Sequence, residues 1–208
     1  MIRVVLFDLD GVIRHFDPKT VADIELRHGL PAGALESSAF AMPLIDEVTT
    51  GRITRAEWVR QVGEQVGSAA AAQEWGTQPA EVDDAMLELS DELRASGLRT
   101  AVLTNGTDTI PDEIIAHGIA DRFDGFFNSA EIGFTKPDVR AFQHVLHALG
   151  AAATEVFFTD DSPSKLTGAD SLSMRTHLFV GADELRVQLI AAGIDIGRTR
   201  GDAAGVPR

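Results

Sequence analysis

The sequence predicts an α/β fold, with a doubly wound, mostly parallel sheet and a small helical domain inserted after its first strand. Short runs rich in Val, Ile, Leu and Phe are typical of buried parallel strands. Five such runs occupy residues 3–7, 100–104, 123–127, 156–159 and 176–180. Helical patterns alternate with these runs in the second part of the chain, as in doubly wound folds. No comparable run lies between residues 13 and 99, so we expect an insertion there.

The helices of the second part are predicted from apolar residues that recur every three or four positions. Val82, Met86, Leu89 and Leu93 follow this spacing, and Gly97 comes next as a C-terminal cap. Similar patterns predict helices over residues 110–117, 138–149, 163–172 and 183–192. Each of these helices would cover one face of the sheet.

The insertion is expected to be helical throughout. Thr54 and Glu57 have the spacing of a capping box, which places a helix start ahead of Trp58. Pro43 and Gly51 help to divide the region into four expected helices. The predicted division is a core of residues 1–14 and 81–197 and a helical cap of residues 15–80. Residues 198–208 lack apolar periodicity, so we expect a disordered tail.

Composition excludes several classes of function. The chain of 208 residues has a net charge of −14 and only 18 Lys and Arg residues, which argues against nucleic acid as a partner. No apolar run reaches the roughly 18 residues that a membrane-spanning helix needs. With no cysteine, disulfides, thiolate metal sites and cysteine nucleophiles are excluded. The first residues enter a strand directly, without the pattern of a secretion signal, so we expect a cytoplasmic location.

Polar side chains follow four of the predicted strands. They are Asp8 and Asp10, Thr104 and Asn105, Lys136, and Asp160 and Asp161. Because the carboxyl ends of parallel strands meet at one edge of the sheet, we expect these side chains to lie together. Phosphoryl transfer needs this combination of carboxylates, hydroxyl and amine. A magnesium ion would hold the carboxylates together and offset the charge of a phosphate group.

The motifs Asp-Leu-Asp-Gly-Val-Ile, Leu-Thr-Asn-Gly, Lys-Pro-Asp and Thr-Asp-Asp-Ser-Pro occur in this order along the chain. Together they resemble the four motifs of the haloacid dehalogenase-like hydrolase superfamily. The resemblance extends from residue 2 to about residue 180, and the helical insertion resembles the cap of the first subclass. It implies a Rossmann-like core, Mg²⁺ as cofactor and phosphatase activity on a small phosphorylated metabolite.

The resemblance also implies roles for individual residues. Asp8 would be the nucleophile that becomes an aspartyl-phosphate, and Asp10 the general acid and base. Family members that displace halide carry another residue at the position of Asp10, so its presence favours phosphate ester hydrolysis.

The Mg²⁺ ligands implied by the resemblance are the Asp8 carboxylate, the Asp10 backbone carbonyl and Asp161. Asp160 would lie behind these ligands without binding the ion directly. The groups implied to bind the phosphoryl oxygens are those of Lys136, Thr104 and Asn105, the last through its backbone.

Two residues depart from the family pattern. Lys165 stands where an asparagine is common, and Ser173 where a glycine is common. The Lys165 ammonium group would lie over the phosphate, point outward or weaken Mg²⁺ binding by repulsion. Sugar phosphates are the first expectation for the substrate. The alternatives are a phosphomutase or other phosphotransferase of the same fold, and a non-catalytic phosphate-binding or receiver-like signalling protein.

Overall fold

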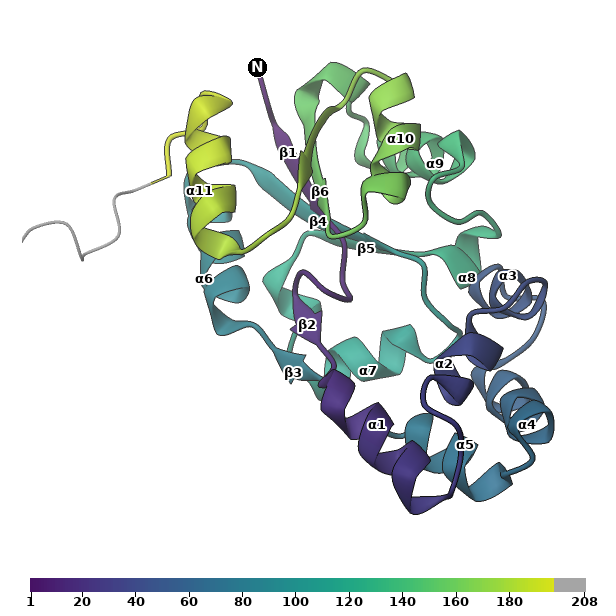
Figure 1. Ribbon diagram of the computed structural model, residues 1–208. Coiled ribbons are helices and arrows are strands. Elements are labelled where there is room, and N and C mark those ends of the chain that lie inside the picture. The colour runs from purple at the N-terminus through teal and green to yellow at the C-terminus, as the bar shows by residue number, and fades with distance from the viewer. Residues whose placement is uncertain (197–208) are drawn as a thin grey trace, which may run out of the picture.

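A five-stranded parallel sheet lies at the centre of the protein (Figure 1). The computed structural model describes residues 1–196. The strands of the sheet are β1 (Val4–Phe7), β4 (Arg99–Thr104), β5 (Gly125–Asn128), β6 (Val156–Asp160) and β7 (Arg175–Leu178). Their order is β5-β4-β1-β6-β7, and all neighbours are parallel. The predicted fold class is therefore confirmed, and the five strands differ from the predicted runs only at their ends.

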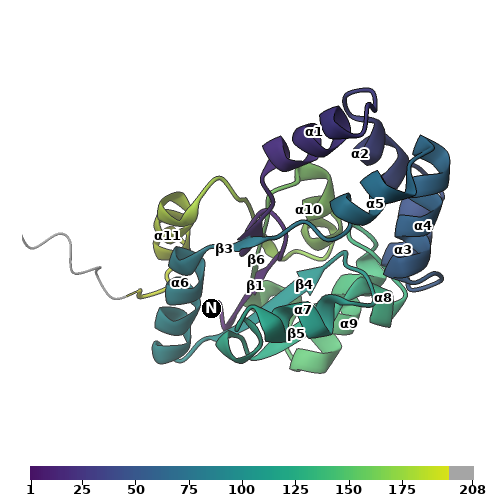
Figure 2. The ribbon, with the colours of Figure 1, turned by 90° about the horizontal axis from the view of Figure 1, so that it is seen from below.

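Helices cover both faces of the sheet, and the alternation of side chains along β1 explains why. Val5 and Phe7 face a core shared with α6 (Asp84–Ala95), α7 (Ile110–Ala116) and α11 (Ala182–Ala191). Val4 and Leu6 face the opposite core, shared with α9 (Val139–Leu149) and α10 (Pro163–Ser171). Figure 2 shows α6 and α11 on one side of the strands and α9 on the other. Since β1 is covered on both faces, its run is apolar throughout.

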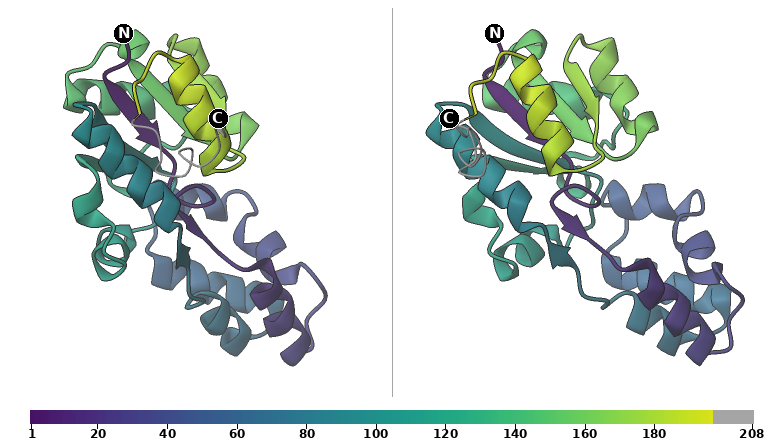
Figure 3. Two further views of the ribbon diagram at one scale, coloured as in Figure 1. Left: turned by 90° about the vertical axis from the view of Figure 1, so that its left-hand side faces the viewer. Right: turned by 60° about the vertical axis from the view of Figure 1, so that its left-hand side comes forward.

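The chain leaves the core through β2 (Arg14–His15) and returns through β3 (Glu81–Val82). These two short strands pair antiparallel, with Arg14 opposite Val82 and His15 opposite Glu81. Five helices lie between them: α1 (Pro18–Arg27), α2 (Ala34–Ala39), α3 (Leu44–Thr49), α4 (Arg55–Val66) and α5 (Ala69–Trp75). Figure 3 shows these helices grouped at one end of the molecule. The predicted number of four was wrong, because the six-residue helices α2 and α3 are too short to show apolar periodicity.

The inserted helices have a hydrophobic core of their own. Trp58 and Trp75 meet edge to face in it, with ring centroids 4.9 Å apart. Thr54 caps α4 by accepting a hydrogen bond from the Glu57 amide at 3.2 Å, as the capping-box spacing predicts. The boundaries of the cap at residues 15 and 80 stay a prediction. Residue 197 and the predicted tail of residues 198–208 lie outside the described residues.

Short helices complete the core. Helix α8 (Ser129–Ile132) and the 3₁₀ turns Ala120–Arg122 and Ala153–Glu155 were not predicted from the sequence. Ser129 donates a hydrogen bond from its hydroxyl to the backbone carbonyl of Thr49 in α3, and so joins the core to the insertion. Within residues 1–196, no helix combines the length and apolar character needed to cross a membrane.

Helix α10 lies against the loop that contains Pro137 because residue 168 is glycine. A Cβ atom at Gly168 would lie 1.9 Å from the Pro137 carbonyl oxygen and 2.8 Å from the ring of Phe142. Contacts this short force neighbouring atoms to move. Lys136 directly precedes Pro137, so Gly168 sets how closely the loop of Lys136 approaches α10.

We expect Gly168→Ala to lower the free energy of unfolding by about 1–3 kcal/mol, the usual cost of overpacking. This cost outweighs the gain of up to about 1 kcal/mol that alanine gives in a helix. Urea unfolding measures the difference. The exposed neighbour Thr167 is the control, and Thr167→Ala is expected to change stability by about 0.5 kcal/mol or less. Equal unfolding midpoints for Gly168→Ala and the unmodified protein would contradict the close approach.

Candidate active site

The loop after β1 brings Asp8 to the carboxyl edge of the sheet. Its backbone amide donates to the carbonyl of Thr159 at 3.0 Å, which continues the pairing of β1 with β6. The chain then turns at Gly11, whose φ of 88° is readily adopted only by glycine. A Cβ atom at Gly11 would lie 2.1 Å from Asp161 Oδ2. Glycine at this position therefore lets the carboxylate of Asp161 approach the loop.

A buried lysine joins the ends of two neighbouring strands. The Lys136 ammonium lies 2.7 Å from Asp8 Oδ1 and 2.6 Å from Asp160 Oδ2, and all three side chains are buried. The backbone of Lys136 is held by the side chain of Asn105, which accepts from its amide at 2.8 Å and donates to its carbonyl at 2.9 Å. The Asn105 side chain thus positions Lys136, and its amide group is engaged there.

The second carboxylate oxygen of Asp8 has no hydrogen-bond partner, although it is buried. Burial raises the pKa of Asp8 above its usual value, while the charge of Lys136 opposes this rise. One oxygen from each of Asp8, Asp160 and Asp161 lies within 4.8 Å of the others. Carboxylate oxygens gathered in this way are ligands that Mg²⁺ prefers, so the residues fit such an ion.

The carboxylates of Asp160 and Asp161 differ in their exposure and in their hydrogen bonds. Both oxygens of the buried Asp160 have partners, since Oδ2 faces Lys136 and Oδ1 accepts from the Ser162 amide at 2.9 Å. Asp161 is exposed. This difference agrees with the expectation that Asp161 binds an ion directly and Asp160 stands behind it, which stays a prediction.

Lys165 points toward the carboxylates. Its ammonium lies 3.9 Å from Asp8 Oδ2, and its side chain is 32% exposed. Burial lowers the pKa of Lys165, but the carboxylates of Asp8, Asp160 and Asp161 outweigh this effect, so the pKa is raised. The outward orientation considered from the sequence is therefore wrong. Ser173 adopts a φ of 66°, the left-handed conformation in which glycine is favoured, and this explains why glycine suits its position.

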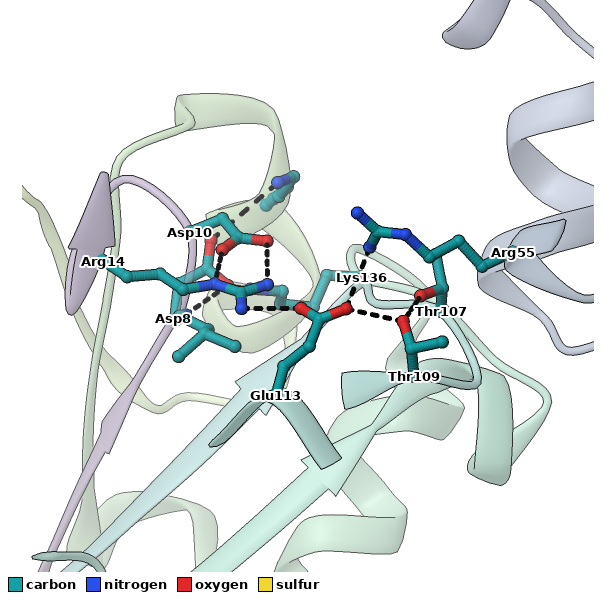
Figure 4. A network of polar contacts seen from close by, with 10 residues as sticks. Asp8, Asp10, Arg14, Arg55, Thr107, Thr109, Glu113 and Lys136 are labelled. Carbon is teal, nitrogen blue, oxygen red and sulfur yellow. Dashed lines mark hydrogen bonds and ion pairs between the residues drawn. The ribbon is translucent and has the colours of Figure 1, made fainter. Parts of the chain in front are cut away.

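A second network surrounds Asp10 (Figure 4). Arg14 is buried and pairs through Nε and Nη2 with the two carboxylate oxygens of Asp10. Its Nη1 donates to Glu113 Oε2 at 2.7 Å. Glu113 Oε1 in turn accepts from Arg55, at the start of α4, at 3.0 Å and from Thr109 at 2.6 Å. The network connects the loop after β1, helix α7 of the core and the insertion.

The pKa of Glu113 reflects this network. Burial alone raises it, but hydrogen bonds from Thr109 and Arg14 and the charge of Arg55 outweigh burial and hold it below its usual value of 4.5. Sequence patterns do not predict the contacts of Arg14, Arg55 and Glu113. None of them belongs to a local motif, and their contacts join residues 99 and 58 positions apart.

The structure thus brings Asp8, Lys136, Asp160 and Asp161 together, as predicted. Thr104 is buried at the end of β4, which lies next to β1 in the sheet. The Asp10 carboxylate is 40% exposed and pairs with Arg14, and it is not one of the three carboxylates whose oxygens lie within 4.8 Å of one another.

Asp10 borders a cavity of about 230 Å³ between the core and the insertion, whose lining also includes Asn105 and Trp58. A larger hollow of about 640 Å³ lies near the start of the chain and includes Met1, Arg3 and Arg99. It lies at the opposite ends of β1 and β4, away from the acidic cluster.

Comparisons with known proteins identify the family. The profile of the haloacid dehalogenase-like hydrolases matches residues 2–171. The chain belongs to this family. The match covers β1, the insertion and β4 to β6, and ends before β7, so the resemblance found in the motifs is confirmed.

Proteins similar to this chain include two phosphatases and one enzyme of known structure. Phosphatase MT3486 of Mycobacterium tuberculosis is 30% identical over 89% of this chain and 90% of that protein. The sesquiterpene phosphatase astK of Aspergillus oryzae is 27% identical over 83% of this chain and 87% of that protein. The solved family enzyme bt-2542 of Bacteroides thetaiotaomicron, in complex with magnesium and inorganic phosphate, is 21% identical. The two structures match over 97% of this chain and 98% of the bt-2542 chain with a TM-score of 0.72, so they have the same fold.

We expect Glu113→Gln to destabilise the protein at pH 7 by about 1–3 kcal/mol, the usual value for hydrogen bonds between charged groups. A carboxyl whose pKa is lower in the folded state stabilises the protein above its unfolded pKa and loses this effect as the pH falls through its folded pKa. The difference between the two proteins should therefore shrink as the pH falls below 4.5.

Urea unfolding at pH 7, 5 and 4 measures the difference. Asp112→Asn is the control, because Asp112 is exposed and lies in the same first turn of α7. The control removes an equivalent charge from the helix start without touching Arg14 or Arg55. A Glu113→Gln difference that stays constant from pH 7 to 4 would contradict the role of the carboxylate.

Proposed function

We propose that the protein is a magnesium-dependent phosphatase that hydrolyses small phosphate monoesters through an aspartyl-phosphate on Asp8. One observation carries this proposal. The buried carboxylate of Asp8, which pairs with Lys136, has one oxygen without a hydrogen-bond partner, and the carboxylates of Asp160 and Asp161 lie close to it. An oxygen in this state suits attack on a phosphorus atom or contact with a cation.

Asp8 is held ready for attack by fixed contacts. Its Oδ1 accepts from the Leu9 amide at 2.8 Å and lies 2.7 Å from the Lys136 ammonium. These contacts leave Oδ2 without a hydrogen bond, with the Lys165 ammonium 3.9 Å away. The positive charge of Lys136 favours the ionised form of Asp8 and offsets the charge of an incoming phosphoryl group.

Asp10 supplies and removes the proton. It protonates the leaving oxygen of the ester and then takes a proton from the water that hydrolyses the aspartyl-phosphate. Its position at the border of the cavity supports this role, because the organic part of the substrate would extend from the leaving oxygen into that space. Arg14 holds both oxygens of Asp10 and fixes the direction of its carboxylate.

The remaining contacts of the phosphoryl group come from the end of β4. The Thr104 hydroxyl and the backbone amide of Asn105 bind its oxygens, since the Asn105 side chain is already engaged with Lys136. Lys165, near Asp8, supplies a second positive charge at the same place. Charge on the phosphoryl oxygens is thereby stabilised as the bond to the leaving group breaks.

Mg²⁺, held by Asp8, Asp161 and the Asp10 backbone carbonyl, would supply two positive charges that neutralise the carboxylates and attract the phosphate. Three carboxylates and two ammonium groups otherwise leave this cluster with one net negative charge. The magnesium and phosphate of bt-2542 and the phosphatase names of the two relatives support this proposal. The cytoplasmic location expected from the sequence stays part of it.

We expect Asp8→Asn to abolish the release of inorganic phosphate from p-nitrophenyl phosphate in Mg²⁺, because the amide cannot attack phosphorus. Acid-quenched protein should carry covalent phosphate in the unmodified chain and none in the variant. Release of inorganic phosphate also separates hydrolysis from transfer to a second alcohol. Normal turnover by a folded Asp8→Asn protein would refute the proposal.

Asp10→Asn should behave differently with different leaving groups. Nitrophenolate leaves without a proton, so the variant should still form the phospho-enzyme and show a burst of nitrophenol. Steady turnover of alkyl phosphates, whose leaving oxygen needs a proton, should fall by about 10²–10⁴-fold. Rapid-quench kinetics with both esters tests this. An equal loss on both esters, with no burst, would contradict the role of Asp10.

Removing a carboxylate from the proposed ion site should weaken Mg²⁺ binding. For Asp161→Asn we expect the affinity for Mg²⁺ to fall by roughly 10–100-fold or more. Loss of a residue that only hydrogen-bonds to a metal ligand already costs this much. Calorimetric titration measures the affinity, and Mg²⁺ should raise the unfolding temperature of the variant less than that of the unmodified protein. Asp23→Asn, on the exposed side of α1, controls for the loss of one charge. Unchanged affinity in Asp161→Asn would exclude it as a ligand.

A further inference from the structure

The cavity beside Asp10 has an apolar wall. We call it the substrate cavity, and it has a volume of about 230 Å³. Its wall combines residues from the insertion, from the segment after β2 and from α7. The apolar side chains include those of Phe16, Val21, Ile45, Trp58, Trp75 and Ile110. A wall of this kind gains free energy from contact with apolar groups.

The arginines that line the cavity are already neutralised. Arg14 pairs with Asp10 and Glu113. Arg55 pairs with Glu113 at 3.0 Å and donates to the Gly76 carbonyl at 2.8 Å. The cavity lining therefore holds, within residues 1–196, no cation free for a second anionic group of a substrate.

The other charged groups of the lining would repel an anion. Asp17 and Glu36 border the cavity, and both are exposed. A carboxylate or second phosphate in the cavity would meet these groups without a compensating positive charge. The cavity thus suits a body without charge.

Most uncharged polar groups of the lining are also engaged. Thr49 donates its hydroxyl hydrogen to the Ile45 carbonyl at 2.6 Å, and Thr107 shares a hydrogen bond of 2.9 Å with Thr109. The Asn105 amide holds Lys136. The lining thus offers few free donors to a body with several hydroxyls, and each hydroxyl oxygen left without a donor costs about 1–3 kcal/mol.

Gln78 is different. It lines the cavity in the segment between α5 and β3, and its Oε1 atom is buried without a hydrogen-bond partner among the described residues. Buried polar side-chain atoms nearly always have a partner. The Gln78 amide therefore offers a place for one polar group of a bound molecule.

We propose that the substrate is the phosphate monoester of a neutral, mainly apolar alcohol, with one polar group that meets Gln78. This inference rests on the proposed phosphatase function and names the substrate class for that site. Since a cavity of about 150 Å³ holds benzene, the substrate cavity accommodates a body of roughly nine non-hydrogen atoms. Sugar phosphates, the first expectation from the sequence, carry more hydroxyls than this lining satisfies.

A matched pair of esters tests the substrate class. Cyclohexylmethyl phosphate and glucose 6-phosphate share a six-membered ring joined to the phosphate through one CH₂ group, and the sugar adds the ring oxygen and the hydroxyls. We expect kcat/KM to be at least about 10-fold higher for the cyclohexyl ester, the ratio that one unsatisfied hydroxyl produces. Phosphoglycolate, whose body is an anion, should be the poorest of the three. Equal or better turnover of glucose 6-phosphate or phosphoglycolate would overturn the inference.

Variants test whether the cavity wall is responsible. Phe40 lines the cavity and is 56% exposed, so Phe40→Ala can remove apolar contact at little cost to folding. It should lower kcat/KM for cyclohexylmethyl phosphate by roughly 10-fold, mainly through KM. Leu26→Ala is the matched control, because Leu26 is 80% exposed on α1 and lies outside the lining. Equal effects of the two variants would count against the proposed wall.

Gln78→Leu tests the polar position. Cyclohexylmethyl phosphate has no group to pair with the amide, so replacing Gln78 by leucine should raise its kcat/KM several-fold and leave the preference over glucose 6-phosphate larger than before. A lower kcat/KM for this ester in a folded Gln78→Leu protein would contradict the role assigned to Gln78. Gln73→Leu, at an exposed position of α5 outside the lining, is the control.

Failure of the substrate class can be separated from failure of the phosphatase function. If p-nitrophenyl phosphate and all other esters are left intact in Mg²⁺, the proposed function is wrong, and the substrate class fails with it. If the aryl ester is hydrolysed and glucose 6-phosphate is preferred to the cyclohexyl ester, only the substrate class fails. Both tryptophans of the chain line the cavity, so their fluorescence should change with cyclohexylmethyl phosphonate, a ligand that cannot be hydrolysed. No change at concentrations that inhibit turnover would place the ligand elsewhere and overturn the inference.

Discussion

The enclosure of Lys136 between Asp8 and Asp160 is the interaction on which the catalytic edge of the sheet depends. A buried ammonium group is tolerated only when its charge is paired, and loss of one partner from a buried pair typically costs about 3–5 kcal/mol. The two carboxylates stand at the ends of β1 and β6, which are neighbours in the sheet. The loop that carries Lys136 is held by Asn105, which follows β4 on the other side of β1. The balance of charge thus depends on the order of three strands.

The polar atoms that the fold leaves unsatisfied lie where a ligand is expected. Among the described residues, two buried side-chain oxygens lack a hydrogen-bond partner, Asp8 Oδ2 and Gln78 Oε1. The first faces the group of carboxylates, and the second borders the substrate cavity. Such atoms reduce stability in an isolated protein. The proposed substrate would account for both positions, with its phosphate at Asp8 and its organic part beside Gln78.

The sequence predicted the sheet and the acidic cluster because both follow from local patterns. Apolar runs mark the strands, and the residues directly after these runs must lie at one edge, so Asp8 and Asp161 could be placed together before their distance was known. The network of Arg14, Glu113 and Arg55 could not be predicted in this way. It arises from side chains distant in sequence, and its geometry depends on how the insertion packs against α7. Gln78 has no local pattern either, because its environment combines core and insertion.

The pairing of β2 with β3 joins the inserted helices to the core at one place. The chain enters and leaves the insertion at adjacent points, and the inserted helices have their own hydrophobic core. Substitutions among these helices can therefore reshape the cavity without disturbing the pairing of β1, β4 and β6. In evolution, such an arrangement allows one hydrolytic edge to acquire new substrates through changes confined to a single continuous stretch of the gene.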